Sequence, residues 1–364
     1  MSKINKLGIA VAAVVGSLAF NAQAETVKVY NWSDYIAEDT IANFEAQTGL
    51  KVSYDVFDSN EVVEAKLLTG NTGFDVVVPS ASFLGRQIQA GVFMKLDRSK
   101  IPNIKHLDPV LMKKLERVDP ANAHAVPYLW GTTGIGYNVE KIAEIFGEDF
   151  QVDSWDLFFK PENISKLASC GVASLDAASE MIPAALHYLG LDPNTHNKAD
   201  IEKAAELLKS VRPHIRYFHS SQYINDLANG DICLAIGWSG DVMQASDRAA
   251  DAENGVTVDY SIPKEGAGMW FDMLAIPADT TNAAGAHQFI NYILEPKVTA
   301  SITDYVWYPN GNKAATPLID PEITAAENIY PPVEVMNKLY TFDVMPAKVS
   351  RITNRAWSDI KAGK

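Results

Sequence analysis

The 364-residue sequence is 47% hydrophobic and 21% charged, an ordinary composition for a globular protein. Its formal net charge of −14 argues against charge-driven binding to nucleic acid or to an anionic membrane, and it suits a cationic ligand. The same charge would also keep an exported protein soluble, so by itself it is a weak functional signal.

The first 24 residues have the pattern of a secretory signal peptide. Lys3 and Lys6 form a short positive region, an apolar stretch runs from Leu7 to Phe20, and Ala22-Gln23-Ala24 is a cleavage site. The stretch is shorter than the ~18 to 20 apolar residues that span a bilayer. No cysteine lies near the cleavage site, which excludes a lipid anchor on an N-terminal cysteine. We therefore expect an exported protein without a membrane anchor that begins at Glu25.

Without this leader, 340 residues remain, too many for one ordinary core and a comfortable length for two lobes. Strand patterns and helical patterns alternate along them. In the first part, strands are predicted at 27–30, 51–56 and 75–78, and helices at 40–48 and 61–68. In the later part, a helix is predicted at 200–211, a buried strand at 231–236 and a helix at 284–294. This order predicts an α/β fold with parallel sheets and right-handed crossovers.

A glycine-containing segment at 130–138 has the composition of a strand that crosses between two lobes, and equally that of an ordinary internal strand. In open α/β sheets, ligands bind outside the carboxyl ends of the strands. Two lobes joined by crossing strands would therefore place those ends around a single cleft.

Cys170 and Cys233 are the only cysteines. In an oxidising compartment an even pair most often forms one disulfide, and two ligands are too few for a structural zinc site.

The sequence carries no recognisable catalytic or metal-binding motif. The segment Gly237–Gly240 lacks the spacing of a G-x-S-x-G nucleophile elbow, and Gly134–Gly136 lacks the third glycine of a dinucleotide fingerprint. The histidines show no metal-helix spacing; they are His106, His124, His187, His196, His214, His219 and His287. We expect no catalytic residue and no metal.

Aromatic residues stand next to carboxylates where predicted strands meet turns. The segments are Trp32–Tyr35, Trp238–Asp241, Trp270–Asp272 and Trp307–Tyr308, together with Asp176 and Glu180 beyond a strand-like stretch at 171–175. A diammonium ligand needs carboxylates and hydroxyls for its ends and flat apolar walls for its methylene chain. Each aromatic alone is more often a core side chain, but their recurrence at several strand ends favours a binding site.

The sequence closely resembles the periplasmic putrescine/spermidine-binding proteins of bacterial ABC polyamine transporters. The resemblance runs over essentially the whole chain and rests on these stretches: V-Y-N-W-S-D-Y-I (29–36), Y-D-V-F-D-S-N-E (54–61), F-D-V-V-V-P-S (74–80), P-Y-L-W-G-T (127–132) and F-H-S-S-Q-Y-I-N-D-L-A-N-G-D-I-C (218–233). It implies the two-lobed type II periplasmic-binding-protein fold, in which each lobe is a mainly parallel sheet flanked by helices and a hinge lets the lobes close. It also implies a disulfide between Cys170 and Cys233.

The resemblance further implies the ligand-binding residues. Trp32, Trp238, Trp270 and Tyr308 would form the walls; Ser33, Asp34, Ser80 and Asp272 would meet one end of the ligand; Glu180 and Asp241 would hold the other, deeper ammonium. It implies a monomeric periplasmic protein that performs no chemistry, needs no cofactor and delivers the polyamine to the membrane permease subunits of an ABC importer. It places lobe 1 at residues 25–131, rejoined by about 250–295, and lobe 2 at 132–249, rejoined by about 296–364.

Two signals for ligand length conflict. Ala177 is small where spermidine-preferring relatives tend to carry an acid, which favours putrescine, whereas Trp270 is the aromatic that spermidine binders prefer. We expect putrescine, with spermidine also bound. The alternatives are a spermidine-preferring receptor, an amino-acid receptor, which the lack of an arginine in the turn motifs disfavours, and an exported hydrolase that uses Asp176 and Glu180.

Overall fold

The computed structural model describes residues 25–364, so the expected signal peptide lies outside the described residues. Strands and helices alternate through the described chain, which confirms the expected α/β class. Among residues 25–364, no helix has the length and apolar character needed to cross a membrane.

The elements have the following bounds. The strands are β1 (Thr26–Trp32), β2 (Lys51–Phe57), β3 (Val76–Val77), β4 (Ala125–Asn138), β5 (Val172–Ser174), β6 (Tyr217–Phe218), β7 (Leu234–Trp238), β8 (Val258–Ser261), β9 (Gly268–Ala275) and β10 (Tyr340–Thr341). The helices are α1 (Thr40–Thr48), α2 (Asn60–Leu68), α3 (Ala81–Gln89), α4 (Pro109–Leu115), α5 (Val139–Phe146), α6 (Asp156–Phe159), α7 (Pro161–Leu167), α8 (Ala178–Tyr188), α9 (Lys198–Val211), α10 (Gln222–Ala228), α11 (Ser239–Asp251), α12 (Ala283–Ile293), α13 (Pro296–Val306), α14 (Pro321–Ala325), α15 (Val333–Met336) and α16 (Ala347–Lys361).

The strands form one mixed sheet in the order β2-β1-β3-β9-β4-β7-β5-β6, with β8 added on β4 and β10 on β9. The pairs β1–β2, β1–β3, β5–β6 and β5–β7 are parallel, as the sequence predicts. In the middle, β4 runs antiparallel to β7, β8 and β9, and β9 runs antiparallel to β3. The long strands β4 and β9 therefore connect two parallel sets of strands.

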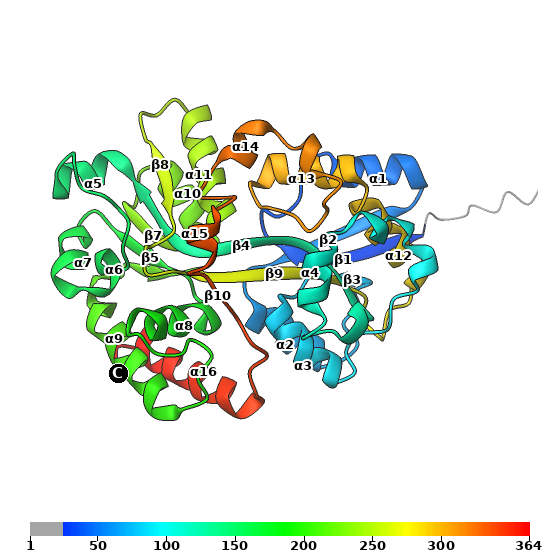
Figure 1. The fold of residues 1–364 in the computed structure, drawn as a ribbon, viewed down its shortest axis with the longest axis horizontal. Coiled ribbons are helices and arrows are strands. Elements are labelled where there is room, and N and C mark those ends of the chain that lie inside the picture. The colour runs from blue at the N-terminus through cyan, green and yellow to red at the C-terminus, as the bar shows by residue number, and fades with distance from the viewer. Residues whose placement is uncertain (1–24) are drawn as a thin grey trace, which may run out of the picture.

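Figure 1 shows β4 and β9 side by side across the middle of the molecule. They join one half, built on β1–β3 with α1–α3 and α12, to another half, built on β5–β7 with α8–α11. We call these the β1 half and the β7 half. Helix α16 packs against α8 and α9 and so returns the end of the chain to the β7 half. The lobe boundaries expected from the sequence stay a prediction.

The sequence of the inner strands explains their position. β3, β5 and β7 consist of buried residues throughout, as expected for parallel strands covered by helices on both faces. The edge strand β2 instead alternates between exposed and partly buried residues along most of its length. The carboxyl ends of β1 and β3 in one half approach those of β5 and β7 in the other, since residues at or just after these ends line one cavity.

Cys170 and Cys233 form the expected disulfide, with their Cα atoms 5.7 Å apart. Cys170 lies just before β5 and Cys233 just before β7, so the bond joins the entrances of two neighbouring strands. It thereby ties the segment after α7 to the sheet of the β7 half.

We predict that this disulfide contributes to stability. Its two cysteines are 63 residues apart in the chain. In the chain-entropy account, a crosslink of this span reduces the entropy of the unfolded chain and stabilises the fold by ~4 kcal/mol. The double substitution Cys170→Ala with Cys233→Ala should lower the midpoint of chemical unfolding, measured by circular dichroism. Alkylation of native wild-type protein should label no thiol without reductant, and two labelled thiols would contradict the assignment.

Candidate functional site

A small cavity lies between the two halves. It is lined by Trp32, Ser33, Tyr35, Ser80, Glu180, Trp238, Asp241, Trp270, Asp272 and Tyr308. Nine of the ten residues proposed from the sequence are in this lining, and Asp34 is not. The structure therefore brings side chains that are up to 276 positions apart in the chain, from Trp32 to Tyr308, into one site.

Strand ends and helix beginnings supply most of the lining. Trp32 ends β1, and Ser80 follows β3 as the residue before α3. Trp238 ends β7, and Asp241 lies in the first turn of α11 directly after it. Glu180 lies in the first turn of α8, which follows β5. Two of the carboxylates thus stand at helix N-termini, where the backbone N–H groups favour a negative charge.

Trp270 and Asp272 reach the cavity in a different way from the one expected. The sequence places them before a strand, whereas in the structure both lie inside β9. Residues two apart in a strand point to the same face, so both side chains can line the cavity. The crossing strand runs past the ends of the parallel strands, and its middle therefore takes part in the site.

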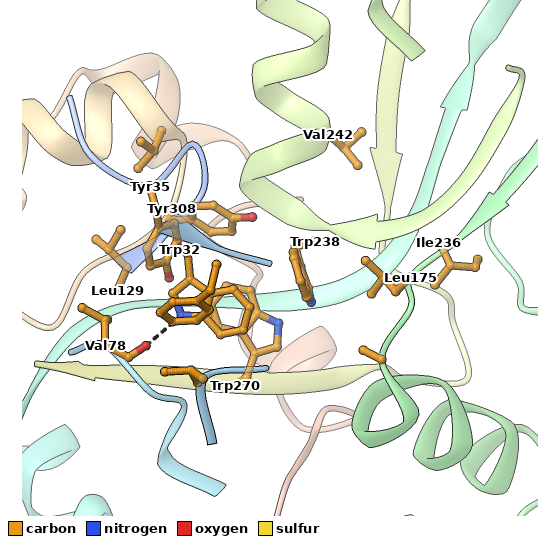
Figure 2. Packing of buried hydrophobic residues seen from close by; sticks show 14 of the residues in the cluster. Trp32, Tyr35, Val78, Leu129, Leu175, Ile236, Trp238, Val242, Trp270 and Tyr308 are labelled. Atoms are coloured by element: carbon orange, nitrogen blue, oxygen red, sulfur yellow. Dashed lines mark hydrogen bonds between the residues drawn. The ribbon is translucent and has the colours of Figure 1, made fainter. Parts of the chain in front are cut away.

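Aromatic rings form the walls of the cavity (Figure 2). The ring centroids of Trp32 and Trp238 are 5.4 Å apart, those of Trp238 and Trp270 are 6.4 Å apart, and those of Trp270 and Tyr308 are 5.4 Å apart, all edge to face. The indole N–H of Trp32 donates to the carbonyl oxygen of Val78 at 2.9 Å, which holds this ring in place. These rings offer flat apolar faces that attract a cation.

Asp272 and Glu180 accept hydrogen bonds from neutral hydroxyl groups. Ser80 donates to one oxygen of Asp272 at 2.5 Å, and Tyr35 donates to the other at 2.8 Å. Thr133 donates to Glu180 at 2.7 Å. A hydroxyl donor satisfies a lone pair of the carboxylate without neutralising its charge, so the negative charge stays available to a ligand.

Asp241 is held in the same manner by two tyrosines. The hydroxyl of Tyr308 donates to Oδ1 at 2.6 Å, and that of Tyr223 donates to Oδ2 at 2.8 Å. Tyr308 lines the cavity, whereas Tyr223 is on α10, behind Asp241 and outside the lining.

Burial raises the pKa of all three carboxyl groups. The pKa of Glu180 is raised to about 8, mainly by desolvation and further by the negative charges of Glu61 and Asp272. Desolvation raises the pKa of Asp241 and of Asp272 to about 7, although the tyrosine and serine hydroxyls act in the opposite direction. No lysine or arginine is in the lining to compensate these charges. The cavity therefore has the electrostatic character of a cation-binding site.

Contacts across the cleft join the two halves around the cavity. Asp34, in the turn after β1, pairs with Arg248 of α11 at 2.6 Å, and its backbone oxygen accepts from Gln244 at 3.2 Å. Glu61 of α2 accepts from the backbone N–H of Ser179, at the start of α8, at 3.4 Å. Asp34 thus lies at the rim, where its carboxylate is occupied by an arginine.

Three residues of this site were not among those expected from the sequence. Tyr35 stands directly after the proposed Trp32–Asp34, Thr133 lies in the expected crossing strand, and Tyr223 is part of the stretch at 218–233. The only available signal was their position within these stretches, because a buried hydroxyl that faces a carboxylate leaves no local pattern. Among residues 25–364, no group of three or more histidine, cysteine, aspartate or glutamate residues is placed to hold a metal ion.

Known proteins resemble this chain in sequence and in fold. Residues 39–331 match the family of bacterial extracellular solute-binding proteins. The chain is 58% identical over 358 residues to the putrescine-binding periplasmic protein PotF of Escherichia coli K12, covering 98% of this chain and 96% of the relative. It is 57% identical to the putrescine-binding periplasmic protein SpuD of Pseudomonas aeruginosa UCBPP-PA14, covering 98% of each. The crystal structure of the spermidine/putrescine substrate-binding protein PotD of Streptococcus pneumoniae superposes with a TM-score of 0.73 at 27% identity, covering 93% of this chain and 99% of the other.

We predict that Glu180→Gln stabilises the protein in the absence of ligand. The folded-state pKa of Glu180, about 8, exceeds its ordinary value of 4.5, so the folded state binds the extra proton and stability falls as pH rises between these values. At neutral pH the unfolded chain has an ionised Glu180 and the folded state a protonated one, and taking up this proton on folding costs at most about 3 kcal/mol; glutamine avoids this cost. The variant should therefore melt at a higher temperature than wild type, by a margin that grows from about pH 5 to pH 8. A margin that is negative, or the same at both ends of this range, would contradict the prediction.

Proposed function

This chain belongs to the bacterial extracellular solute-binding protein family, and we propose that it captures a protonated polyamine in the cavity and delivers it to an ABC importer. The observation that carries the proposal is a box of aromatic rings that holds three buried carboxylates without any lysine or arginine in the lining. A polyamine offers cations for the carboxylates and methylene groups for the rings. Its similarity to two putrescine-binding proteins supports the same ligand class.

The proposed roles follow the positions of the residues. Glu180 and Asp241 hold one ammonium group, Ser33, Ser80 and Asp272 meet the other, and the rings enclose the chain between them. Asp34 acts at the rim, because its carboxylate contacts Arg248. Closure of the β1 half onto the β7 half brings these groups together and exchanges water around the ammonium groups for charge-assisted hydrogen bonds.

Putrescine is the proposed ligand, with spermidine as a second one. Ala177 is buried as the residue before α8, close in sequence to Glu180, and offers no acceptor for an additional amine. Trp270 offers a broad π-face that suits a longer polyamine. A spermidine/putrescine-binding protein of Salmonella typhimurium is 34% identical, less than the two putrescine-binding relatives.

We propose a periplasmic location after removal of residues 1–24, a monomeric state, and the permease subunits of an ABC importer as the protein partner. The leader pattern of the sequence and the similarity to two periplasmic proteins support the location. We propose no catalytic activity, in keeping with a family of solute-binding proteins.

The hydrolase alternative is disfavoured by the position of Asp176. Its carboxylate accepts from the indole N–H of Trp357 at 2.8 Å and from the ammonium of Lys361 at 2.6 Å, both on α16. Asp176 is not part of the cavity lining, so it cannot act there as a partner of Glu180. Titration with diamines beside a glycoside hydrolysis assay separates the two functions, since only a hydrolase would release sugar.

An amino-acid receptor would need an arginine for the ligand carboxylate, and the lining contains none.

We predict that Asp241→Asn and Glu180→Gln each weaken putrescine binding strongly. An ammonium group buried without its carboxylate loses a charge-assisted hydrogen bond of ~1.5 to 3 kcal/mol, so affinity should fall about 10- to 100-fold. Calorimetric titration measures the loss. The matched control is Asp226→Asn, because Asp226 also accepts from a tyrosine, Tyr217 at 2.6 Å, but lies outside the cavity. Wild-type affinity in both site variants would place the ligand elsewhere.

Ligand length is tested with Trp270→Phe and Ala177→Asp. The smaller ring keeps an apolar wall for a four-carbon chain but reduces the π-face for the central ammonium of spermidine. The added carboxylate provides an acceptor near that ammonium and stays unpaired when putrescine is bound. Both ligands must be titrated against each variant, because selectivity is a difference between two affinities. Trp270→Phe should move the ratio toward putrescine and Ala177→Asp toward spermidine; unchanged ratios would show that length is selected elsewhere.

A further inference from the structure

Tyr223 is a fully buried residue outside the cavity that contacts a carboxylate of the site. It lies on α10 with no exposed surface, and its hydroxyl is 2.8 Å from Oδ2 of Asp241. Tyr308, which lines the cavity, contacts the other oxygen, Oδ1, at 2.6 Å. The two oxygens of one carboxylate are therefore each bonded by a phenol hydroxyl.

Backbone amides determine which partner donates in these hydrogen bonds. The backbone N–H of Trp238 donates to the hydroxyl oxygen of Tyr223 at 3.1 Å, and the N–H of Asp241 donates to that of Tyr308 at 3.0 Å. An amide N–H can only donate, so each tyrosine oxygen is an acceptor there and its own proton points to Asp241. A proton on Asp241 would leave a buried hydroxyl without an acceptor, which is costly. The arrangement therefore favours the ionised carboxylate.

Two glycines allow the tyrosines to come this close. A Cβ atom at Gly237 would lie 2.5 Å from the ring of Tyr223, and one at Gly240 would lie 2.6 Å from the ring of Tyr308. Both distances are far below ordinary van der Waals contact. The segment Gly237–Gly240, which lacks the spacing of a nucleophile elbow, thus has room for two tyrosines beside one carboxylate.

We propose that Tyr223 is a positioning residue of the ligand site, which holds Asp241 as a hydrogen-bond acceptor at the cavity wall through a hydroxyl oriented by the Trp238 amide. The inference rests on the proposed function, since Asp241 is taken to bind the ammonium group of a polyamine. It assigns to α10 a part in ligand recognition, although α10 contributes no residue to the lining.

The groups that face Asp241 come from four segments. Tyr223 is on α10, Tyr308 follows α13, Asp34 and Tyr35 are in the segment after β1, and Arg248 is on α11, the helix of Asp241 itself. Burial and Asp34 raise the pKa of Asp241, whereas the two tyrosine hydroxyls and Arg248 lower it. Loss of the Tyr223 hydroxyl would therefore raise the pKa further. An ammonium ligand needs the ionised form of Asp241. As pH is lowered, the variant should therefore lose its affinity for the ligand at a higher pH than wild type does.

The test is the pH dependence of putrescine affinity in Tyr223→Phe, measured by calorimetric titration. Near neutral pH, affinity should fall ~10-fold or more, because a hydrogen bond to a charged group is lost. The difference in putrescine affinity between the variant and wild type should become smaller as pH rises to about 8.5. At that pH Asp241 is ionised in both proteins and the ligand is still protonated. An unchanged affinity would overturn the proposal, as would a loss of equal size at every pH, which is the signature of a purely structural role.

The matched control is Tyr260→Phe. Tyr260 is also buried, its hydroxyl bonds that of Thr132 at 2.8 Å, and it does not line the cavity. The control removes a neutral hydroxyl group from the interior without breaking a hydrogen bond to a carboxylate, so the pH profile of binding should match that of wild type. If Tyr260→Phe shifted the pH profile of putrescine affinity as much as Tyr223→Phe does, the shift would come from general destabilisation, and the proposal would be contradicted.

A double substitution keeps the inference separate from the proposed function. When Asp241 is already asparagine, Tyr223→Phe should cause no further pH-dependent loss, because the group that it acts on is absent. Independent, additive losses would contradict the proposal. If wild-type protein itself bound no polyamine, the proposed function would fail; if wild type bound and Tyr223→Phe behaved like wild type, only the inference would fail. Melting curves of each variant establish that it is folded.

Discussion

The site depends on one constraint, which is that three carboxylates are buried in an aromatic cavity without a cation to accompany them. Desolvation favours the neutral form of each of them, and with all neighbouring groups included their pKa values are raised to about 7 or 8. The surrounding hydroxyl groups oppose this without supplying positive charge, and Arg248, which lies outside the lining, lowers the pKa of Asp241. Hydroxyl groups donate to the oxygens, and Glu180 and Asp241 stand in the first turns of α8 and α11. A protein arranged in this way leaves its charge to be balanced by a ligand.

The fold distributes these groups so that neither half has a complete site. Trp32 and Ser80 come from the β1 half, whereas Glu180 and Asp241 come from the β7 half, and the crossing strand β9 supplies Trp270 and Asp272 between them. Separation of the halves would therefore return the carboxylates to water, and closure without a ligand would bury them at a cost. The contacts of Asp34 with Arg248 and of Glu61 with Ser179 hold the rim, but neither compensates the charge inside. Ligand charge and closure are linked for this reason.

Most of the fold and the charged lining were predictable from the sequence, because local patterns carry them. Apolar runs marked β1, β3 and β7, and the aromatics at strand ends indicated Trp32 and Trp238. The placement of Trp270 and Asp272 at a strand boundary was wrong, since periodicity does not tell a crossing strand from its flanking turn. Thr133 and Tyr223 were not found, because they matter only through the carboxylates that they contact across the fold. Long-range hydrogen bonds leave no period in the sequence.

Charge selection and length selection arise from different parts of the cavity. The hydroxyl groups donate hydrogen bonds to the carboxylates whether or not a ligand is present. Any cation of suitable shape is therefore attracted to the carboxylates in the same way. Under the proposed function, discrimination by length would come from packing against Trp270, which lines the cavity, and from the lack of an acceptor at Ala177, which precedes α8 outside the lining. A site built on a neutral hydroxyl network is therefore specific for charge, while its preference for length can change through substitutions that leave the carboxylates and their tyrosines in place.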